Sequence, residues 1–227
     1  MTLEIIIILV MSSLILAILI GICTFWIIDR FYGEKIAKMV VRLFKRKKRN
    51  VEQEKVLAFV TDFSSVLAKL SSDKVGALIV IENRDNLKKY IDLGNKIDSV
   101  FFSEFVFSVF YNHKSALHDG AMIIKDWRIV CLSTYLPVSK RLMDVKYGAR
   151  HRAAFGISEI TDALAFVVSE TTGKISHMYL DKSVQLSSEP IKLAEQILKI
   201  FEDVAMFNPS DSKKKLDVKD MQTSLKK

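Results

Sequence analysis

The sequence has little glycine, proline or cysteine, and it lacks the standard nucleotide-binding motifs. Eight glycines and three prolines in 227 residues are too few for a low-complexity linker protein. The two cysteines, Cys23 and Cys131, stand in separate apolar runs, which gives little support to a disulfide framework or a zinc site and fits a reducing compartment. Neither G-x-x-x-x-G-K-S/T nor G-x-G-x-x-G occurs, and H-E-x-x-H and G-x-S-x-G are absent as well. If the protein binds phosphate groups, it therefore binds them with a structure other than these known loops.

The net charge of +8 lies mostly outside the central part of the chain. Residues 1–50 carry nine Lys and Arg against three Asp and Glu, residues 51–207 carry 19 against 20, and residues 208–227 carry six against three. A nearly neutral central part lacks the basic surface with which proteins hold nucleic acid. We therefore expect no nucleic-acid partner, and the 50% hydrophobic content excludes a chain that is disordered throughout.

The N-terminal region predicts one membrane anchor. Ile5–Ile28 carries no charge and is long enough for a transmembrane helix. A cleaved signal peptide is the alternative, but the basic residues follow the apolar run and no small-x-small cleavage site is evident. Because basic flanks stay cytoplasmic, the main domain is expected in the cytoplasm of a single-pass cell-membrane protein. The expected parts are a short extracytoplasmic N-terminus at 1–4, the span at 5–28, a basic juxtamembrane segment at 29–50 that contacts anionic lipid, a cytoplasmic domain at 51–207 and a flexible basic tail at 208–227.

Apolar spacing predicts both helices and strands in the cytoplasmic domain. A 3.6-residue period predicts an amphipathic helix at 51–70, and an apolar run rich in β-branched residues predicts a buried strand at 75–81. The other expected elements are helices at 103–111, 148–160 and 189–206 and strands at 121–125, 128–135, 163–169 and 175–180. The expected fold is an α/β domain with a mixed central β-sheet flanked by helices, preceded by one N-terminal transmembrane helix.

Two clusters carry residues that suit phosphate or metal chemistry. Asp119 precedes Gly120-Ala121, so there is little side-chain bulk beside its carboxylate. Such a carboxylate suits a metal ion and a nearby phosphate. The alternative is a plain Asx turn, which has the same residues. Arg150-His151-Arg152 stand where a helix is expected to begin, and a bound polyphosphate would offset three potentially cationic residues there. The alternative for the second cluster is a solvated basic edge paired to Glu159 or Asp162.

A third cluster, Ser169-Glu170, follows an expected strand. Such residues usually form a polar hairpin turn. If the turn closes over the same cleft, Glu170 supplies a second carboxylate for a metal and Ser169 a hydroxyl for phosphate.

Four motifs resemble, in their order and spacing, the diadenylate cyclase domain. They are Gly76-Ala77-Leu78-Ile79, Leu117-His118-Asp119-Gly120-Ala121, Arg150-His151-Arg152-Ala153-Ala154 and Ser169-Glu170. The resemblance covers about residues 55–185 and includes matching residues between the motifs, at Tyr135-Leu136-Pro137 and Gly156-Ile157-Ser158-Glu159. With one predicted span, the chain is similar to the single-span membrane type found in mycoplasmas.

The resemblance implies an enzyme that makes the second messenger cyclic di-AMP and two pyrophosphates from two ATP molecules. Two domains would face each other in a homodimer, at least transiently, so that each holds one ATP. The catalytic residues implied are Asp119, Arg150, His151 and Arg152, the last three holding the polyphosphate. The implied ATP contacts are Gly76, Ala77, Gly120, Ala121, Tyr135, Leu136, Ser169 and Glu170. Asp119, His118 and Glu170 are the implied ligands of a divalent metal, Mg²⁺ or Mn²⁺, with Co²⁺ as a further candidate.

One departure from the family and two other functions remain open at this point. Ala149 stands where relatives often have a threonine, and one lost hydroxyl contact costs about 1 kcal/mol of binding. A membrane-tethered nucleotide sensor without turnover would have the same fold, although such a protein is expected to lose Asp119 or an arginine of the 150–152 motif. A structural membrane adaptor would explain residues 1–50 but not the four motifs.

Overall fold

The computed structural model describes the backbone of residues 2–139 and 147–206 and the side chains of residues 7–24, 26, 53–139 and 147–206. The chain divides into two compact units, Met1–Glu52 and Gln53–Lys227. The first helix, α1, is Thr2–Ser72 and contributes residues to both units. The predicted tail at 208–227 and the side chains of the predicted lipid-contacting segment at 29–50 lie outside the described residues.

In the first unit, α1 contains one stretch, Ile7–Thr24, that is long and apolar enough to cross a membrane. Its apolar side chains are exposed, for example Ile8 and Leu16. The stretch lies inside the predicted span at 5–28, while insertion into a membrane stays a prediction.

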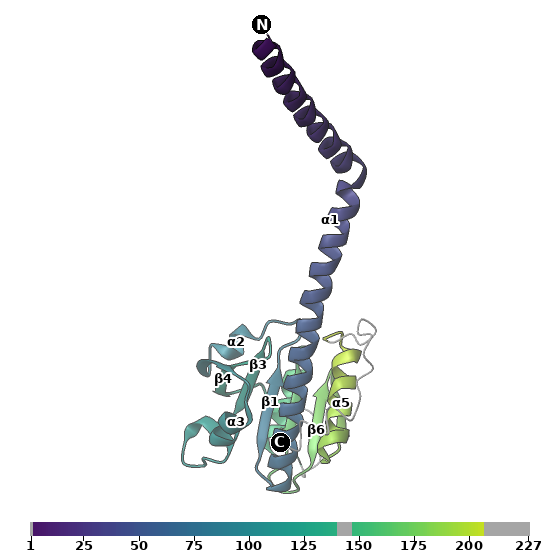
Figure 1. The fold of residues 1–227 in the computed structure, drawn as a ribbon. Helices are drawn as coiled ribbons and strands as arrows, with labels where there is room; N and C mark the ends of the chain where they lie inside the picture. Colours follow the sequence, from purple (N-terminus) through teal and green to yellow (C-terminus); the bar gives the residue numbers. More distant parts are fainter. Residues whose placement is uncertain (1, 140–146, 207–227) are drawn as a thin grey trace. The chain divides into compact units, whose positions relative to one another are not determined.

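The second unit is built on a seven-stranded sheet in the order β2-β4-β3-β1-β5-β6-β7 (Figure 1). The strands are β1 Ala77–Ile81, β2 Asn95–Val100, β3 Ala121–Lys125, β4 Arg128–Thr134, β5 Leu164–Val168, β6 Ile175–Tyr179 and β7 Lys182–Leu186. β1 pairs in parallel with β3, and the other pairs are antiparallel. The predicted mixed sheet is confirmed.

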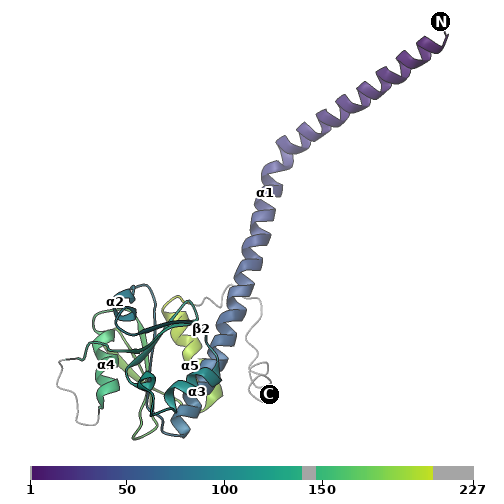
Figure 2. The ribbon, with the colours of Figure 1, turned by 90° about the vertical axis from the view of Figure 1, so that its left-hand side faces the viewer.

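Helices cover both faces of this sheet (Figure 2). The helices after α1 are α2 Lys88–Ile91, α3 Ser103–Phe110, α4 Ala149–Ser158 and α5 Pro190–Asp203, and η1 Ala116–His118 is a short 3-10 helix. The C-terminal part of α1 lies with α3 and α5 on one face, and α4 lies with α2 on the other. The predicted flanking helices are therefore confirmed.

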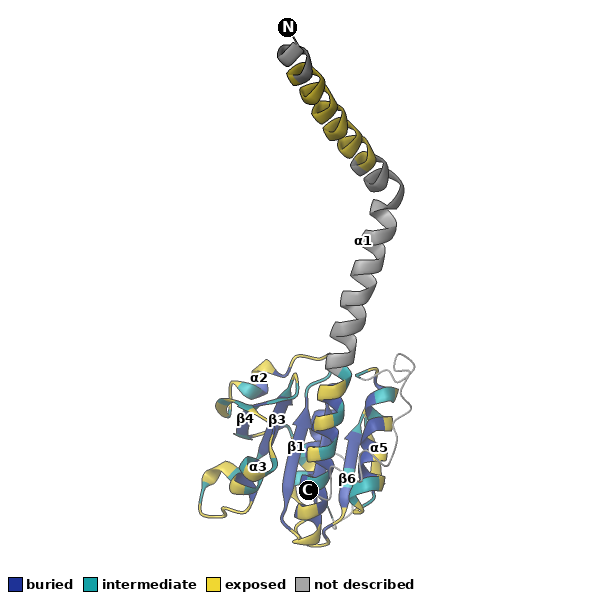
Figure 3. Ribbon diagram, in the orientation of Figure 1, coloured by how far each residue is buried: buried dark blue, intermediate teal, exposed yellow. Residues whose placement is uncertain are grey.

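The central strand β1 is buried on both of its faces (Figure 3). Ala77, Ile79 and Ile81 pack in the core beneath α1, α3 and α5, whereas Leu78 and Val80 pack beneath α4 and α2. Successive side chains of a strand point to opposite faces, so a strand covered on both sides needs a continuous apolar run. This is why the run predicted as a buried strand at 75–81 forms the middle of the sheet.

The sequence prediction omits β2, β7 and α2. β2 and β7 are the two edge strands, and most of their residues are exposed. An edge strand buries few side chains, so it leaves no apolar run or clear alternation in the sequence. The amphipathic helix predicted at 51–70 is confirmed as part of α1, with Val56, Phe59 and Phe63 buried.

Candidate active site

The four sequence motifs meet at one end of the central strands. β1 and β3 run in the same direction, so the residues that precede them, Gly76 and Gly120, lie at the same end of the sheet. β4 and β5 run in the opposite direction, so the residues that follow them, Tyr135 and Ser169, lie at this end too. The register aligns Ala77 with Val168 and Ala121 with Thr134. We call this end of strands β4, β3, β1 and β5 the site end of the sheet.

Arg150, Glu170 and Gly76 are packed against one another at the site end. Arg150 Nη1 donates a hydrogen bond to Glu170 Oε2 over 2.6 Å. A Cβ atom on Gly76 would lie 2.7 Å from Arg150 Nη1 and 2.9 Å from Glu170 Oε2, so only glycine leaves room for this pair. The sequence alternatives, Glu159 and Asp162, are not the partners of Arg150.

The Arg150 guanidinium keeps unused hydrogen-bonding capacity. Its Nε atom is buried and has no hydrogen-bond partner in the part of the chain that the structure describes. The side chain is 21% exposed, so the group is largely withdrawn from water. An arginine fork with a free donor suits an oxyanion such as phosphate.

The three residues of the Arg150-His151-Arg152 motif have different surroundings. His151 is buried on the sheet side of α4, and this burial lowers the pKa of its imidazole. His151 is therefore neutral near pH 7 and adds no charge to the first turn of the helix, contrary to the count of three potential cations. Arg152 is exposed, and its backbone carbonyl accepts a hydrogen bond from the Ser139 N–H. The structure thus places Arg150 alone of the three against Gly76 and Glu170.

Asp119 stands at the start of β3 with an exposed carboxylate. That carboxylate makes no hydrogen bond or ion pair to any described residue, and its backbone N–H bonds the Ala116 carbonyl. The next residue, Gly120, has φ +88°, and a Cβ atom on it would lie 2.7 Å from the Thr134 carbonyl oxygen. Glycine is required there both for the left-handed backbone and for the close approach of β4. The glycine of this Asp-Gly pair is therefore required by the packing of β3 against β4.

The predicted metal ligands are not gathered into one cluster. Among the described residues, no group of three or more His, Cys, Asp or Glu side chains could hold a metal ion. β3 and β5 lie on either side of β1, so Asp119 and Glu170 start from strands two spacings apart, about 10 Å. Glu170 is instead paired with Arg150. His118 Nδ1 bonds the Ser115 carbonyl, which leaves its Nε2 as the nitrogen that could accept or ligate.

The turn after β5 fixes where Glu170 lies. Ser169 donates its backbone N–H to the Lys174 carbonyl, and its Oγ accepts from the Thr172 N–H. The Ser71 hydroxyl, near the end of α1, donates to the Gly173 carbonyl. The Ser169 hydroxyl therefore shapes the turn that carries Glu170, besides any contact with a phosphate.

The segment that follows β4 is held against α4 by Ser139 and Gly156, for which no functional role was predicted from the sequence. Tyr135 is 69% exposed, whereas Leu136 is buried. The Ser139 hydroxyl donates to Glu159 Oε1 over 2.5 Å. A Cβ atom on Gly156 would lie 1.9 Å from the Pro137 carbonyl oxygen, so α4 and this segment are in backbone contact. The only sequence signal for this contact is the glycine itself.

We expect Gly156→Ala to destabilise the domain by about 1–3 kcal/mol, because the added methyl overpacks a backbone contact. Because the Tyr135-Leu136 segment must move away from α4, the ATP binding that the resemblance implies for this segment should weaken as well. Chemical unfolding and nucleotide titration measure the two effects. Gly21→Ala is the control, because its Cβ would meet nothing within 4 Å and the residue lies outside the unit 53–227. Equal unfolding midpoints for both variants would contradict the packing argument.

Comparison with known proteins gives one consistent family. The family model described as "DisA bacterial checkpoint controller nucleotide-binding" matches residues 64–183. A protein named diadenylate cyclase from Mycoplasma genitalium is 42% identical over 77% of this chain and 88% of its own length. Another of that name from Mycoplasma pneumoniae is 42% identical over 73% and 82%, respectively.

Solved structures agree with these sequence relatives. The crystal structure of a DacA double mutant from Staphylococcus aureus has 34% identity and a TM-score of 0.58, and the match covers 64% of this chain and 94% of that one. A protein from Bacillus cereus, titled a hypothetical membrane spanning protein, has 30% identity and a TM-score of 0.54, over 70% and 79% of the two chains.

Proposed function

This chain belongs to the diadenylate cyclase family, and we propose that it joins two ATP molecules into cyclic di-AMP with release of two pyrophosphates. The observation that carries the proposal is the site end of the sheet. There the Arg150 guanidinium lies against Gly76, and the Asp119 carboxylate lies at the same end; neither Arg150 Nε, which is buried, nor this carboxylate has a partner among the described residues. Phosphoryl transfer needs such charge placement more than it needs a covalent nucleophile.

The triphosphate is assigned to the start of α4. Gly148, the N-cap residue, offers no side-chain cap to the first turn of this helix. The first N–H groups of a helix have no partner inside the helix, and these groups and the Arg150 fork both favour an anion. Arg152, exposed and without a side-chain partner among the described residues, extends the positive charge outward. The neutral His151 packs on the buried face of α4 and can donate one N–H.

The adenine is assigned to the segment after β4. Tyr135 presents an exposed ring, and the backbone at Leu136 can read the edge of the base. Because Ser139 and Gly156 hold this segment on α4, the base and the phosphates are bound by parts that are fixed to each other. A rigid pair of subsites holds one ATP in a fixed orientation, so that its 3′-hydroxyl and α-phosphate are presented in defined directions to the ATP of the other copy.

A divalent metal, Mg²⁺ or Mn²⁺ with Co²⁺ as a further candidate, is assigned to Asp119, with His118 Nε2 as a further candidate ligand. The donor set fits, because Mg²⁺ is usually held by one or two carboxylates together with substrate phosphates and water. Such an ion, when bound, would neutralise charge on the phosphates and would lower the pKa of a bound hydroxyl. The Asp119 carboxylate itself can orient the attacking 3′-hydroxyl. Glu170 would reach the ion only if its bond to Arg150 opened.

Catalysis is proposed to need two copies of the chain. A site that holds one ATP cannot bring a second 3′-hydroxyl to its own α-phosphate, so the attacking nucleotide must come from another copy. Two identical sites that face each other form the two bonds of the cyclic product by the same chemistry. The proposed localisation is the cell membrane, through Ile7–Thr24 and the basic segment at 29–50, with the catalytic unit in the cytoplasm.

The test is a product assay with the full chain in detergent micelles. With ATP and Mn²⁺ we expect cyclic di-AMP and pyrophosphate in a ratio of about one to two, as the stoichiometry of two closing bonds demands. Excess chelator should stop product formation, and added Mn²⁺ or Mg²⁺ should restore it. ATP binding without any dinucleotide would favour the sensor, and activity that survives complete chelation would contradict the metal assignment.

A further inference from the structure

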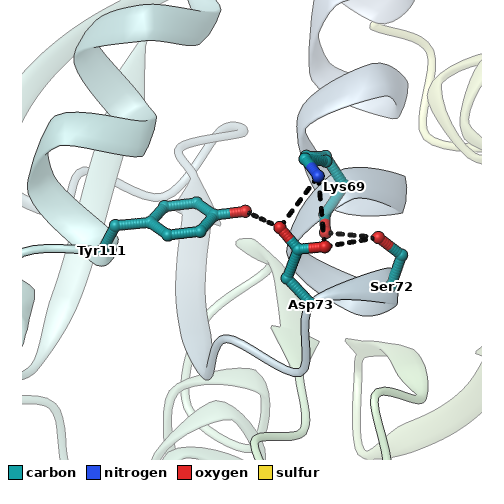
Figure 4. A network of polar contacts seen from close by, with 4 residues as sticks. All are labelled: Lys69, Ser72, Asp73 and Tyr111. Carbon is teal, nitrogen blue, oxygen red and sulfur yellow. Dashed lines mark hydrogen bonds and ion pairs between the residues drawn. The ribbon is translucent and has the colours of Figure 1, made fainter.

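The end of α1 and the end of α3 are joined by a tyrosine–aspartate hydrogen bond (Figure 4). The Tyr111 hydroxyl donates to Asp73 Oδ2 over 2.5 Å, and the two residues are 38 positions apart in the sequence. Lys69 and Ser72 hold the same carboxylate from within α1 and its last turn. Asp73 is therefore already oriented by its own helix, and Tyr111 is the group that comes from elsewhere in the fold.

From Asp73 the chain leads directly to Gly76. The Asp73 N–H bonds the Lys69 carbonyl, and the Val75 N–H bonds the Leu70 carbonyl. Lys74 between them has φ +53° and closes the helix end. The backbone from Asp73 to Gly76 is thus fixed in place, next to Arg150 and Glu170.

From Tyr111 the chain leads to Asp119. Most hydrogen bonds in this segment are local turns, such as Ser115 N–H to the Asn112 carbonyl and Asp119 N–H to the Ala116 carbonyl. No residue from 111 to 119 is buried. Apolar packing therefore does little to place the segment. Its long-range hydrogen bonds within the described chain are Tyr111 to Asp73 at one end and Ser133 Oγ to the Ala116 carbonyl at the other.

We infer that Tyr111 is a positioning residue that fixes the Asp119 segment relative to Gly76 and Arg150. This rests on the proposed function, in which Asp119 and Arg150 act on the same ATP. The hydroxyl touches neither substrate nor metal in this account and acts through the backbone that it anchors. Without this hydroxyl, residues 111–119 would keep the Ser133 contact but lose the hydrogen bond to Asp73, which links them to Gly76 and Arg150.

The charges of the pair keep the bond in place over a wide pH range. The hydrogen bond from Tyr111 is the main cause that lowers the pKa of Asp73 to about 2, with Lys69 and Ser72 adding to it. Partial loss of hydration around the phenol, and then the bond to Asp73, raise the pKa of Tyr111 to about 12, although the side chain as a whole is exposed. The acceptor is therefore ionised and the donor protonated at every pH used in an enzyme assay, so the anchor is permanent and not a pH switch.

The test compares Tyr111→Phe with Tyr179→Phe in the full chain. Tyr179 lies on β6, and its hydroxyl makes no hydrogen bond to any described residue. For Tyr111→Phe we expect kcat to fall about tenfold and the half-saturating metal concentration to rise several-fold, while KM for ATP stays within about twofold. Hydrogen exchange of the amides at 112–119 should become faster. The Tyr179→Phe variant should match wild type in all four.

A double-mutant cycle with Asp73→Ala identifies the bond itself. If Tyr111 acts through Asp73, the double variant should lose no more kcat than the more impaired single variant. Lys69→Met removes an exposed ion pair and should change kcat less than about twofold.

The inference is overturned if Tyr111→Phe keeps wild-type kcat and exchange rates, or if the losses in the cycle add. A wild-type chain that forms no dinucleotide would instead refute the proposed function, and the exchange measurement would still decide whether the bond holds the segment.

Discussion

Asp119→Asn is expected to lower the rate of cyclic di-AMP formation about a thousandfold or more while leaving the fold intact. The amide keeps the size of the side chain but loses the negative charge that a hard cation requires. Folding should not suffer, because the Asp119 carboxylate is exposed and bonds no described residue. Product formation by mass spectrometry and the unfolding midpoint measure the two parts. Asp126→Asn, in the turn between β3 and β4 at the other end of these strands, is the matched control.

The same variant also tests the need for two copies. When equal amounts of wild type and Asp119→Asn exchange subunits freely, about a quarter of the dimers carry two intact sites. Output per wild-type chain should then fall to about half, and mixed dimers should release the linear dinucleotide that results from one bond. Output that simply follows the amount of wild-type chain would refute the facing-site mechanism.

Arg150→Lys is expected to lower kcat/KM for ATP about 30-fold or more, although the charge is retained. Arg150 uses Nη1 for Glu170 and has Nε left over for a second acceptor. A lysine ammonium is a single point charge, so it cannot donate to two acceptors in the two directions that the planar guanidinium provides. Arg128 is a partly exposed arginine at the far end of β4 that pairs with Asp98, and Arg128→Lys should show less than about a twofold change.

Steady-state kinetics and ATP titration separate binding from turnover for these arginine variants. Wild-type kinetics for Arg150→Lys would indicate a diffuse basic patch in place of a directed fork. A loss of the same size in Arg128→Lys would point to general charge effects and not to the site.

The central strands and main helices could be predicted because burial leaves a pattern in the sequence. The apolar run of β1 and the helical spacing of Val56, Phe59 and Phe63 are such patterns. The edge strands β2 and β7 could not be predicted, because half or more of each strand faces solvent. Local sequence therefore predicts the layers better than it predicts the width of the sheet.

Candidate site residues could be named from the motifs, but their mutual arrangement could not. The partner of Arg150 is Glu170, which a strand and a turn bring to it, and not Glu159 or Asp162, which are nearer in the sequence. Burial of His151 depends on the packing of α4, and it removes a charge that composition alone would count. The bond between Tyr111 and Asp73 joins two helix ends and has no local signature.

The pairing of β1 has a consequence for the order in which the protein is synthesised. β1 lies between β3 and β5, and its residue Ile81 pairs with Leu164, so both neighbours are translated after it. A nascent chain must carry a strongly apolar strand with no partner on either edge until β3 is made, and with one edge still uncovered until β5 is made. Contacts this far apart form late, and an uncovered strand of this kind invites association with other chains. Since Gly76 is made early and Glu170 late, ATP cannot assist the early steps of folding.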